Sequence, residues 1–270
     1  AYKQWGLECL DRFNGMFAFA LWDGPCRRLI LARDRLGKKP LFYYKLPRGG
    51  LIFASELKAL LEDPRVPRKM NMRALSQYLS FGYVTGEETM LGEVKKLAPG
   101  HYLTVEEKQE IIPKQYWDLK KCFLNKRKFS SSFAASQELL QLLQDAIKLR
   151  LVSDVSLGAF LSGGIDSSSI VAGMCHSQPS ETHQTFSMGF REESFSELEM
   201  AKRVARHLKV IHKDQIVLPN LAENLSEIAY FADEPFADTS IIPMYYLAEF
   251  SRKNVTVCLS GDGADETLGG

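Results

Sequence analysis

The chain of 270 residues is 45% hydrophobic and 11% aromatic, which predicts two domains that each bury a core. Its 34 basic residues nearly cancel 33 acidic ones and leave a formal net charge of +1, so no overall field recruits nucleic acid or an acidic membrane, and small molecules are the expected partners. Five scattered cysteines without metal-ligand spacing, and no apolar run near the ~20 residues that span a bilayer, predict a cytoplasmic protein without disulfides, zinc or a membrane segment.

The first part of the chain predicts antiparallel β-structure. Apolar runs flank Asp23-Gly-Pro25, a turn sequence that joins two paired strands. Strands are expected at residues 17–22, 27–32, 40–44 and 51–54, followed by a short helix at 56–61. Cys9 precedes the first strand in a predicted helix, and we interpret it as a packed residue.

A polar stretch without periodicity at residues 119–132 predicts a linker between a domain at 1–118 and a domain at 133–270. Its basic residues are Lys120, Lys121, Lys126, Arg127 and Lys128. We interpret them as a solvated surface, and a phosphate-binding role is the alternative.

From residue 136 the hydrophobic period becomes helical, and strands then alternate with helices. Helices are expected at 136–150, 167–175, 196–208, 221–231 and 242–250, and strands at 157–161, 185–190, 211–217 and 255–259. Leu139, Leu143 and Ile147 lie on the buried stripe of the first helix, and Ser196 with Glu199 predicts a capping box on the third. The alternation predicts a doubly wound parallel sheet whose strands open their carboxyl ends onto one crevice.

A glycine loop follows Leu161 at the end of the first of these strands. Gly163 and Gly164 have no Cβ, so an anion can approach their amides closely, and the following helix directs its free N–H groups at the same place. Candidate phosphate-binding residues are Ser162, Gly163, Gly164, Ser167 and Ser168. The alternative is an ordinary strand-to-helix turn with Asp166 as the N-cap. The sequence from 162 to 168 resembles the pyrophosphate loop of ATP pyrophosphatases, which cleave ATP between its α- and β-phosphates.

Acidic residues lie in three predicted loops on the same edge of the sheet: at Asp166, at 233–238 and at 260–266. Converging carboxylates are costly unless a cation neutralises them, and Mg²⁺ bound to ATP phosphates is the simplest candidate. We therefore predict Asp166 and Asp265 as metal ligands, with helix capping as the alternative. For Asp233 and Glu234, a helix-terminating turn before Pro235 stays an open alternative.

The spacing of the segments 161–168, 233–238 and 260–266 resembles the synthetase domain of glutamine-hydrolysing asparagine synthetases. In the first part of the chain, 13–20, 33–41, 54–58 and 97–100 resemble the later part of the class II glutaminase domain of that family. The resemblance implies α+β followed by α/β folds: a partial Ntn-type αββα sandwich, then a partial doubly wound parallel-sheet ATP-pyrophosphatase domain.

The resemblance also implies substrates and roles. The adenosine part of ATP is expected against Leu161, Met188, Ser260 and Gly261, with pyrophosphate on residues 162–168 and Mg²⁺ on the predicted metal ligands. Asp262 and Glu266 are the candidate catalytic residues, which orient substrate or a basic residue, and capping of a following helix is the alternative. Aspartate is adenylated and then amidated by ammonia from glutamine, in an enzyme expected to be a homodimer.

The chain departs from the family pattern at both ends. No cysteine occupies a terminus, and the glutaminase cysteine and its glutamine-binding segments would lie before Ala1. A later catalytic lysine and much of the acceptor site would follow Gly270. We expect a fragment that is inactive alone. Two alternatives remain: a related amidotransferase or β-lactam synthetase acting on another carboxylate, and a non-catalytic ATP-binding relic.

Overall fold

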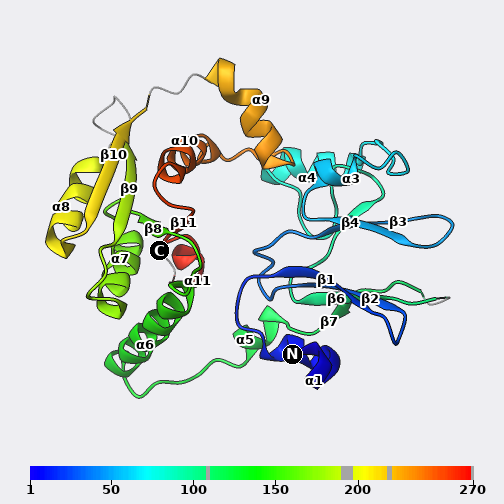
Figure 1. Cartoon of the computed structure of the whole chain (residues 1–270), viewed down its shortest axis with the longest axis horizontal. Helices are drawn as coiled ribbons and strands as arrows, with labels where there is room; N and C mark the ends of the chain where they lie inside the picture. The colour runs from blue at the N-terminus through cyan, green and yellow to red at the C-terminus, as the bar shows by residue number, and fades with distance from the viewer. Residues whose placement is uncertain (108–109, 190–196, 218–220, 269–270) are drawn as a thin grey trace. The chain divides into compact units, whose positions relative to one another are not determined.

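A computed structural model describes residues 1–107, 110–189, 197–217 and 221–268. The chain forms two compact units: unit 1 contains Ala1–Arg127 and Ala229–Asp238, and unit 2 contains Lys128–Ile228 and Thr239–Gly270. Figure 1 shows the helices and strands of each unit. No helix in the described part of the chain is long and apolar enough to cross a membrane.

Unit 1 contains two antiparallel sheets. The first has the order β1-β2-β6-β7, and the second has the order β4-β3-β5. Their strands are β1 (Ala18–Asp23), β2 (Arg28–Arg33), β3 (Phe42–Lys45), β4 (Leu51–Ala54), β5 (Val94–Lys96), β6 (His101–Val105) and β7 (Lys114–Gln115). The predicted hairpin is confirmed, with Ala18 opposite Arg33. The sequence did not predict β5, β6 or β7.

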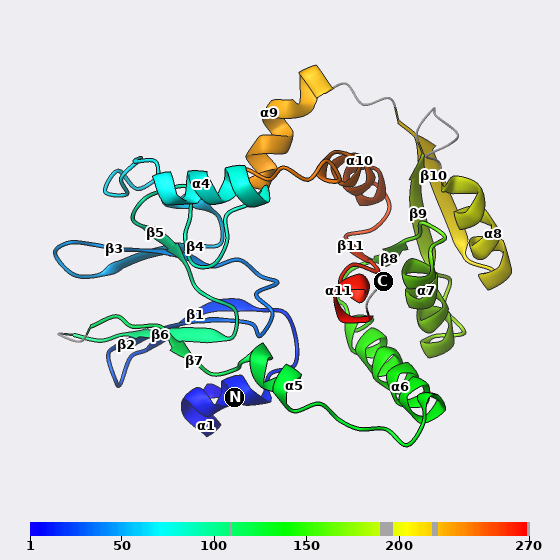
Figure 2. The same cartoon turned by 180° about the vertical axis from the view of Figure 1, so that it is seen from behind.

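The two sheets of unit 1 share a core and carry helices on their outer faces. Leu31 and Leu103 of the first sheet pack with Tyr43 of the second. Its helices are α1 (Tyr2–Trp5), the 3₁₀ turn η1 (Gly6–Glu8), α2 (Cys9–Arg12), α3 (Leu57–Leu60), α4 (Met72–Phe81) and α5 (Leu119–Leu124). Cys9 is 2% exposed and packs against the first sheet, as predicted, while Leu57 of α3 packs against the second. The order of layers is helix, sheet, sheet, helix (Figure 2).

Unit 2 contains one parallel sheet with the order β10-β9-β8-β11. Its strands are β8 (Leu157–Phe160), β9 (Gln184–Gly189), β10 (Ile211–Ile216) and β11 (Val257–Leu259). The chain first adds strands on one side of β8 and then returns to place β11 on the other side, which is the order of a doubly wound fold. The prediction is confirmed, and the switch point lies between β8 and β11.

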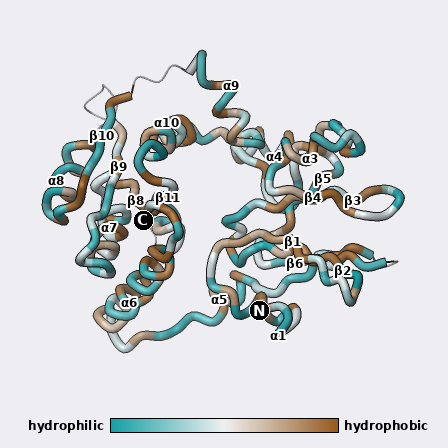
Figure 3. The backbone as a smooth tube through the Cα atoms, in the orientation of Figure 1, coloured by the Kyte–Doolittle hydropathy of each residue, from teal (hydrophilic) through white to brown (hydrophobic). Residues whose placement is uncertain are grey.

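Helices cover both faces of this sheet. The helices of this part of the chain are α6 (Ser132–Arg150), α7 (Ile165–Ser177), α8 (Leu198–Leu208), α9 (Leu221–Ala232), α10 (Ile241–Arg252) and α11 (Ala264–Leu268). Those that pack on the sheet are α6, α7 and α8 on one face and α10 on the other. Ala159 packs in one core with residues of α6, α7 and α8. Phe186 points to the opposite face, because side chains alternate along a strand, and its ring meets Phe250 of α10 edge-on at 6.0 Å. Figure 3 shows hydrophobic and hydrophilic positions alternating along α6.

Several expectations differ from the structure. The predicted linker at 119–132 contains α5 and the first residue of α6, which begins at Ser132 because the Ser131 hydroxyl caps it by accepting from the Ala134 amide at 3.1 Å. Leu139 is 45% exposed rather than buried, because the core face of α6 turns instead through Leu143 and Ile147. The predicted capping box includes Ser196, and the predicted strand at 185–190 includes Phe190; both residues lie outside the described ranges.

Candidate functional site

A cavity of about 430 Å³ lies in unit 2 at the carboxyl ends of β8, β9 and β11. Its walls include ten of the residues that the sequence singled out: Leu161, Ser162, Asp166, Ser167, Met188, Ser260, Gly261, Asp262, Asp265 and Glu266. Gly163 and Gly164 of the same loop, and Ser168 of α7, are not among the residues that line the cavity. The switch point of the sheet therefore brings together residues about 100 positions apart in sequence.

The glycine loop has a conformation that other residues would not reproduce. Gly163 has φ +90°, and a Cβ there would lie 2.7 Å from the Ala201 amide nitrogen of α8. Gly164, with φ −66°, is the N-cap of α7 and makes no side-chain cap bond. The alternative that Asp166 is the N-cap is therefore wrong, because Asp166 lies inside the first turn of the helix.

Serine hydroxyls hold the loop in place. The hydroxyls of Ser162 and Ser167 are 2.9 Å apart, and the Ser162 hydroxyl accepts from the Gly164 amide at 3.2 Å. The Ser187 hydroxyl donates to the Leu161 carbonyl. The Ser168 hydroxyl oxygen is buried and has no hydrogen-bond partner within the described residues. Of the three predicted hydroxyl donors, Ser162 and Ser167 stabilise the loop, and Ser168 has no hydrogen-bond partner within the described residues.

The loop after β11 lies directly against the first turn of α7. A Cβ on Gly261 would come within 2.9 Å of the Ser167 amide nitrogen and 3.0 Å of the Asp166 Cβ, so only glycine fits there. The Ser260 hydroxyl donates to the Asp262 carboxylate at 2.8 Å. This close approach places Asp265, in α11, in the same cavity as Asp166.

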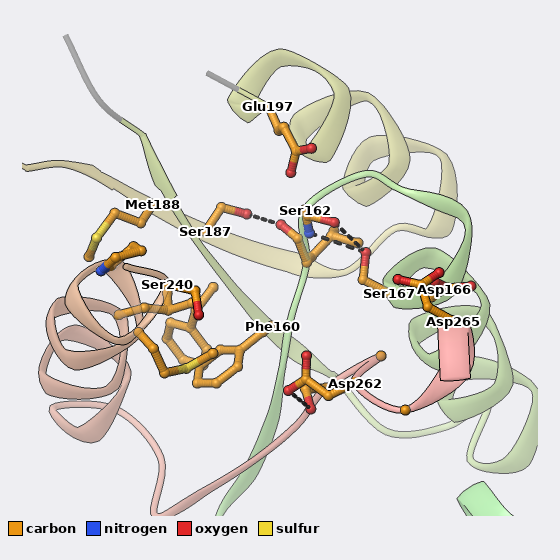
Figure 4. A pocket seen from close by; sticks show the side chains of 18 of the residues that line it. Phe160, Ser162, Asp166, Ser167, Ser187, Met188, Glu197, Ser240, Asp262 and Asp265 are labelled. Carbon is orange, nitrogen blue, oxygen red and sulfur yellow. Dashed lines mark hydrogen bonds between the residues drawn. The ribbon is translucent and has the colours of Figure 1, made fainter. Parts of the chain in front are cut away.

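The side-chain carboxylates of Asp166 and Asp265 form no hydrogen bond or ion pair with any described residue. Figure 4 draws both carboxylates at the end of the cavity opposite Met188. No group of three or more His, Cys, Asp or Glu side chains that could hold a metal ion occurs within the described ranges, and Asp166 and Asp265 line the same cavity as two carboxylates. An open carboxylate pair suits a cation that retains water or takes oxygens from a bound ligand.

The sequence missed the residues of the cavity's opposite wall. Ser240, the N-cap residue of α10, and Pro243, Met244 and Leu247 of α10 line the cavity together with Phe160 of β8. Glu197, the N-cap residue of α8, also lines the cavity. The serine before an apolar helix was the available signal for α10, but only packing shows which helix face meets the cavity. The site therefore offers an apolar end for a flat ring, a glycine loop for an anion and carboxylates for a cation.

The predicted third acidic loop does not join this site. Asp233 follows α9 at φ +64° and accepts hydrogen bonds from the backbone amides of Leu57 and, at 3.0 Å, Lys58. It belongs to unit 1, where it caps α3. The helix-terminating turn is thus the correct interpretation, and the placement of 233–238 at the cavity is corrected, because its carboxylates find partners elsewhere in the chain.

Comparison with protein families gives two matches. Residues 1–117 match the model described as a glutamine amidotransferase domain, and residues 138–270 match the model described as asparagine synthase. The first match falls on the two antiparallel sheets of unit 1, and the second falls on the parallel sheet with its cavity.

Individual proteins are similar over the whole chain. Glutamine-hydrolysing asparagine synthetase 1 of Bacillus subtilis is 36% identical over 100% of this chain and 42% of its own length. Asparagine synthetase 3 of the same organism is 32% identical, with 45% of its length covered. The amidase chyE of Penicillium rubens is 33% identical, with 42% covered. The chain therefore spans less than half the length of these relatives.

Proposed function

The chain belongs to the glutamine-hydrolysing asparagine synthetase family, and on that premise we propose that the cavity of unit 2 binds ATP and activates a carboxylate by adenylation. One observation carries this proposal. The glycine loop between β8 and α7 lies at the switch point of the sheet, facing two carboxylates that have no partner in the described chain. An anion and a cation together satisfy both features.

The nucleotide is proposed to lie along the cavity. Its ring packs at the apolar end against Met188, Phe160 and Met244, and its phosphates meet the amides of the glycine loop and the first turn of α7. Asp166 and Asp265 fit Mg²⁺, because they are oxygen donors left without protein partners. When bound, the ion neutralises phosphate charge. Positioning and charge neutralisation are the expected sources of rate enhancement in such transfers.

The proposed reaction proceeds in two steps. A carboxylate oxygen of aspartate attacks the α-phosphorus, the bond from that phosphorus to the bridging oxygen breaks, and pyrophosphate leaves. Ammonia then attacks the acyl carbon and AMP leaves, giving asparagine. Unit 1, which we propose to be part of an Ntn-type glutaminase domain, belongs to the machinery that releases ammonia from glutamine. Asp262 and Glu266 are proposed to orient the acceptor from the loop after β11 and from α11.

The acceptor carboxylate is the part of the proposal that most needs a test. A relative named as an amidase is as similar to this chain as one of the asparagine synthetases, so another acceptor is the second candidate. Exchange of labelled pyrophosphate into ATP by the full-length protein, measured with ammonia as the nitrogen source and a panel of carboxylates, separates the two. Exchange that depends on aspartate supports asparagine synthesis. Exchange only with another carboxylate replaces the acceptor, and no exchange with any of them rejects adenylation.

A further inference from the structure

Glu197 is an acidic residue of the cavity to which the proposed reaction assigns no role. It is the N-cap residue of α8, but its side chain makes no capping hydrogen bond to that helix. The carboxylate also has no hydrogen bond or ion pair with any described residue. Figure 4 draws it pointing into the cavity, between Met188 at one end and the two aspartates of the proposed metal site at the other. A charged group that faces a cavity without a protein partner is available to a ligand.

The first turn of α8 is packed against the glycine loop. Leu198 is 6% exposed, and Ala201 is fully buried in the core that the helices form on the sheet. The Ala201 amide donates to the Glu197 carbonyl at 3.0 Å. A Cβ on Gly163 would lie 2.7 Å from that same amide nitrogen, so the turn and the loop approach each other closely. The backbone of Glu197 is therefore fixed beside the loop, while its side chain stays accessible to the cavity.

The charged side chains that line the cavity, among the described residues, are all acidic. They are Asp166, Glu197, Asp262, Asp265 and Glu266. A carboxylate and a phosphate repel each other unless a cation lies between them, and Asp166 and Asp265 are proposed to hold that cation. The Asp262 carboxylate accepts from the Ser260 hydroxyl in the loop after β11. Glu197 comes from a different element, α8, and it suits a neutral part of the nucleotide that donates hydrogen bonds.

The ribose is the part of ATP that connects the ring to the phosphates. With the ring at Met188 and the phosphates at the glycine loop, the ribose lies in the middle of the cavity, where Figure 4 draws Glu197. A carboxylate has acceptor positions for two neighbouring hydroxyls, and an acidic residue binds a ribose hydroxyl in the doubly wound dinucleotide-binding folds. We propose that Glu197 accepts hydrogen bonds from the 2′- and 3′-hydroxyls of ATP and makes the cavity specific for a ribonucleotide; this rests on the proposed function.

Calorimetric titration of the full-length protein with nucleotide, at a fixed Mg²⁺ concentration and without an acceptor carboxylate, tests this role without requiring turnover. The wild type is expected to bind ATP about tenfold more tightly than 2′,3′-dideoxy-ATP, or better, because the hydrogen bonds are made to a charged group. In Glu197→Ala the two affinities are expected to agree within about threefold, through loss of affinity for ATP alone. An affinity ratio that stays at the wild-type value would overturn the proposal.

Glu199→Ala is the matched control. Glu199 lies in the first turn of the same helix, but its side chain is 85% exposed, pairs with Lys202 at 3.8 Å and does not line the cavity. This variant is expected to keep the wild-type ratio of affinities for ATP and 2′,3′-dideoxy-ATP. Loss of the ratio in both variants would show that charge near the start of α8 acts at a distance, which would also overturn direct contact between Glu197 and the ribose.

A second variant, Glu197→Gln, separates ribose binding from other roles and serves if Glu197→Ala does not fold. It keeps the shape of the side chain and one acceptor oxygen, so its affinity ratio is expected to lie between those of the wild type and Glu197→Ala. Weaker binding of ATP and of the dideoxy analogue by the same factor would assign Glu197 to the phosphates or to folding and overturn the proposal. A higher Mg²⁺ requirement with an unchanged ratio would make Glu197 a metal ligand, which also overturns it.

Failure of the proposed function gives a different result from failure of this inference. If the wild type exchanges pyrophosphate into ATP but binds ATP and the dideoxy analogue equally, the function stands and the role of Glu197 is rejected. If the preference for ATP is present and is lost in Glu197→Ala, but no carboxylate supports exchange, the role of Glu197 stands and adenylation is rejected. If the wild type binds no nucleotide, both are rejected.

Discussion

Two aspartates, one in each unit, come soon after a β-strand, Asp34 directly after β2 and Asp166 in the first turn of α7 after β8, but their surroundings are opposite. Asp34 of unit 1 is 2% exposed, and its carboxylate accepts from the amides of Phe17, Leu36, Lys38 and Lys39 at 3.0 to 3.2 Å. Asp166 of unit 2 faces a cavity and has no partner within the described residues. A carboxylate that accepts hydrogen bonds from several backbone amides stabilises the loop around it. A carboxylate in a cavity that has no hydrogen-bond partner is available to bind a ligand.

The neighbouring arginine supports this distinction. The Arg33 guanidinium donates to the carbonyls of Leu97, Gly37 and Lys39 at 2.7 to 2.8 Å. Burial lowers its pKa from the ordinary value, but the three carbonyls supply the acceptors that a buried cation needs. Within the motif at residues 33–41, which the sequence linked to a glutaminase domain, the side chains of Arg33 and Asp34 therefore hold the backbone in place, and Arg33 also ties β2 to the residue that follows β5.

The largest expected effect comes from the open carboxylates. Asp265→Asn in the full-length protein should reduce pyrophosphate exchange by about 10²- to 10³-fold, because an amide cannot supply the charge that a phosphate-bound cation needs. The midpoint of urea unfolding should stay close to that of the wild type, because no described protein contact is lost. A large loss of stability with full activity would reverse the assignment of this residue.

The second effect is on stability. Asp34→Ala should destabilise unit 1 by ~3 kcal/mol or more, because it leaves several buried amides without an acceptor. Urea unfolding followed by the fluorescence of the tryptophans in residues 1–127 measures the change. Asp63→Ala is the control: this carboxylate also accepts from a loop amide and pairs with Arg65, but it sits on an exposed turn. Equal losses of unfolding free energy in the two variants would show that burial of the Asp34 carboxylate adds nothing to its stabilising effect.

A pair of adjacent glycines sharpens the description of the cavity loop. Gly163→Ala should cost ~2 kcal/mol, because φ is positive and the new methyl group would meet α8 at 2.7 Å. Gly164→Ala has an ordinary φ, and its Cβ would lie 3.3 Å from the Ser162 hydroxyl, so it should be better tolerated. Unfolding midpoints and ATP affinity of both variants give the comparison. If Gly164→Ala lowers the unfolding midpoint or the ATP affinity more than Gly163→Ala does, steric contact and backbone strain do not explain why glycine is needed in this loop.

The sequence predicted the features that depend on neighbouring residues. The strand and helix periods indicated the doubly wound sheet, and the glycine spacing after Leu161 placed the loop that ends at its switch point. It failed at 233–238, where the partners of Asp233 and Glu234 lie 176 and 144 positions away and leave no local pattern. It also missed Met244 and Glu197, because only packing decides which side of a helix lines a cavity.

The smallest expected effect concerns the phenol of Tyr43, which is buried in the core between the two sheets of unit 1. Burial, with a smaller contribution from the carboxylate of Glu87, raises the pKa of Tyr43 from the ordinary tyrosine value of 10.0 to about 12. The unfolded chain releases this proton near pH 10, and the folded chain releases it near pH 12. The neutral phenol therefore makes its full contribution to the free energy of unfolding below pH 10, and this contribution is lost as the pH rises to 12. At pH 11 the loss is ~1.4 kcal/mol relative to pH 9.

Tyr43→Phe should therefore flatten the fall in urea-unfolding stability between pH 9 and pH 11. Tyr83→Phe, which removes a phenol that is 51% exposed, should keep the wild-type slope. Identical slopes in both variants would show that the alkaline loss of stability arises at other groups. The contrast between the buried Asp34 of unit 1 and Asp166 in the cavity of unit 2 would then rest on hydrogen bonding alone. A flatter slope only in Tyr43→Phe extends that contrast from hydrogen bonding to proton binding.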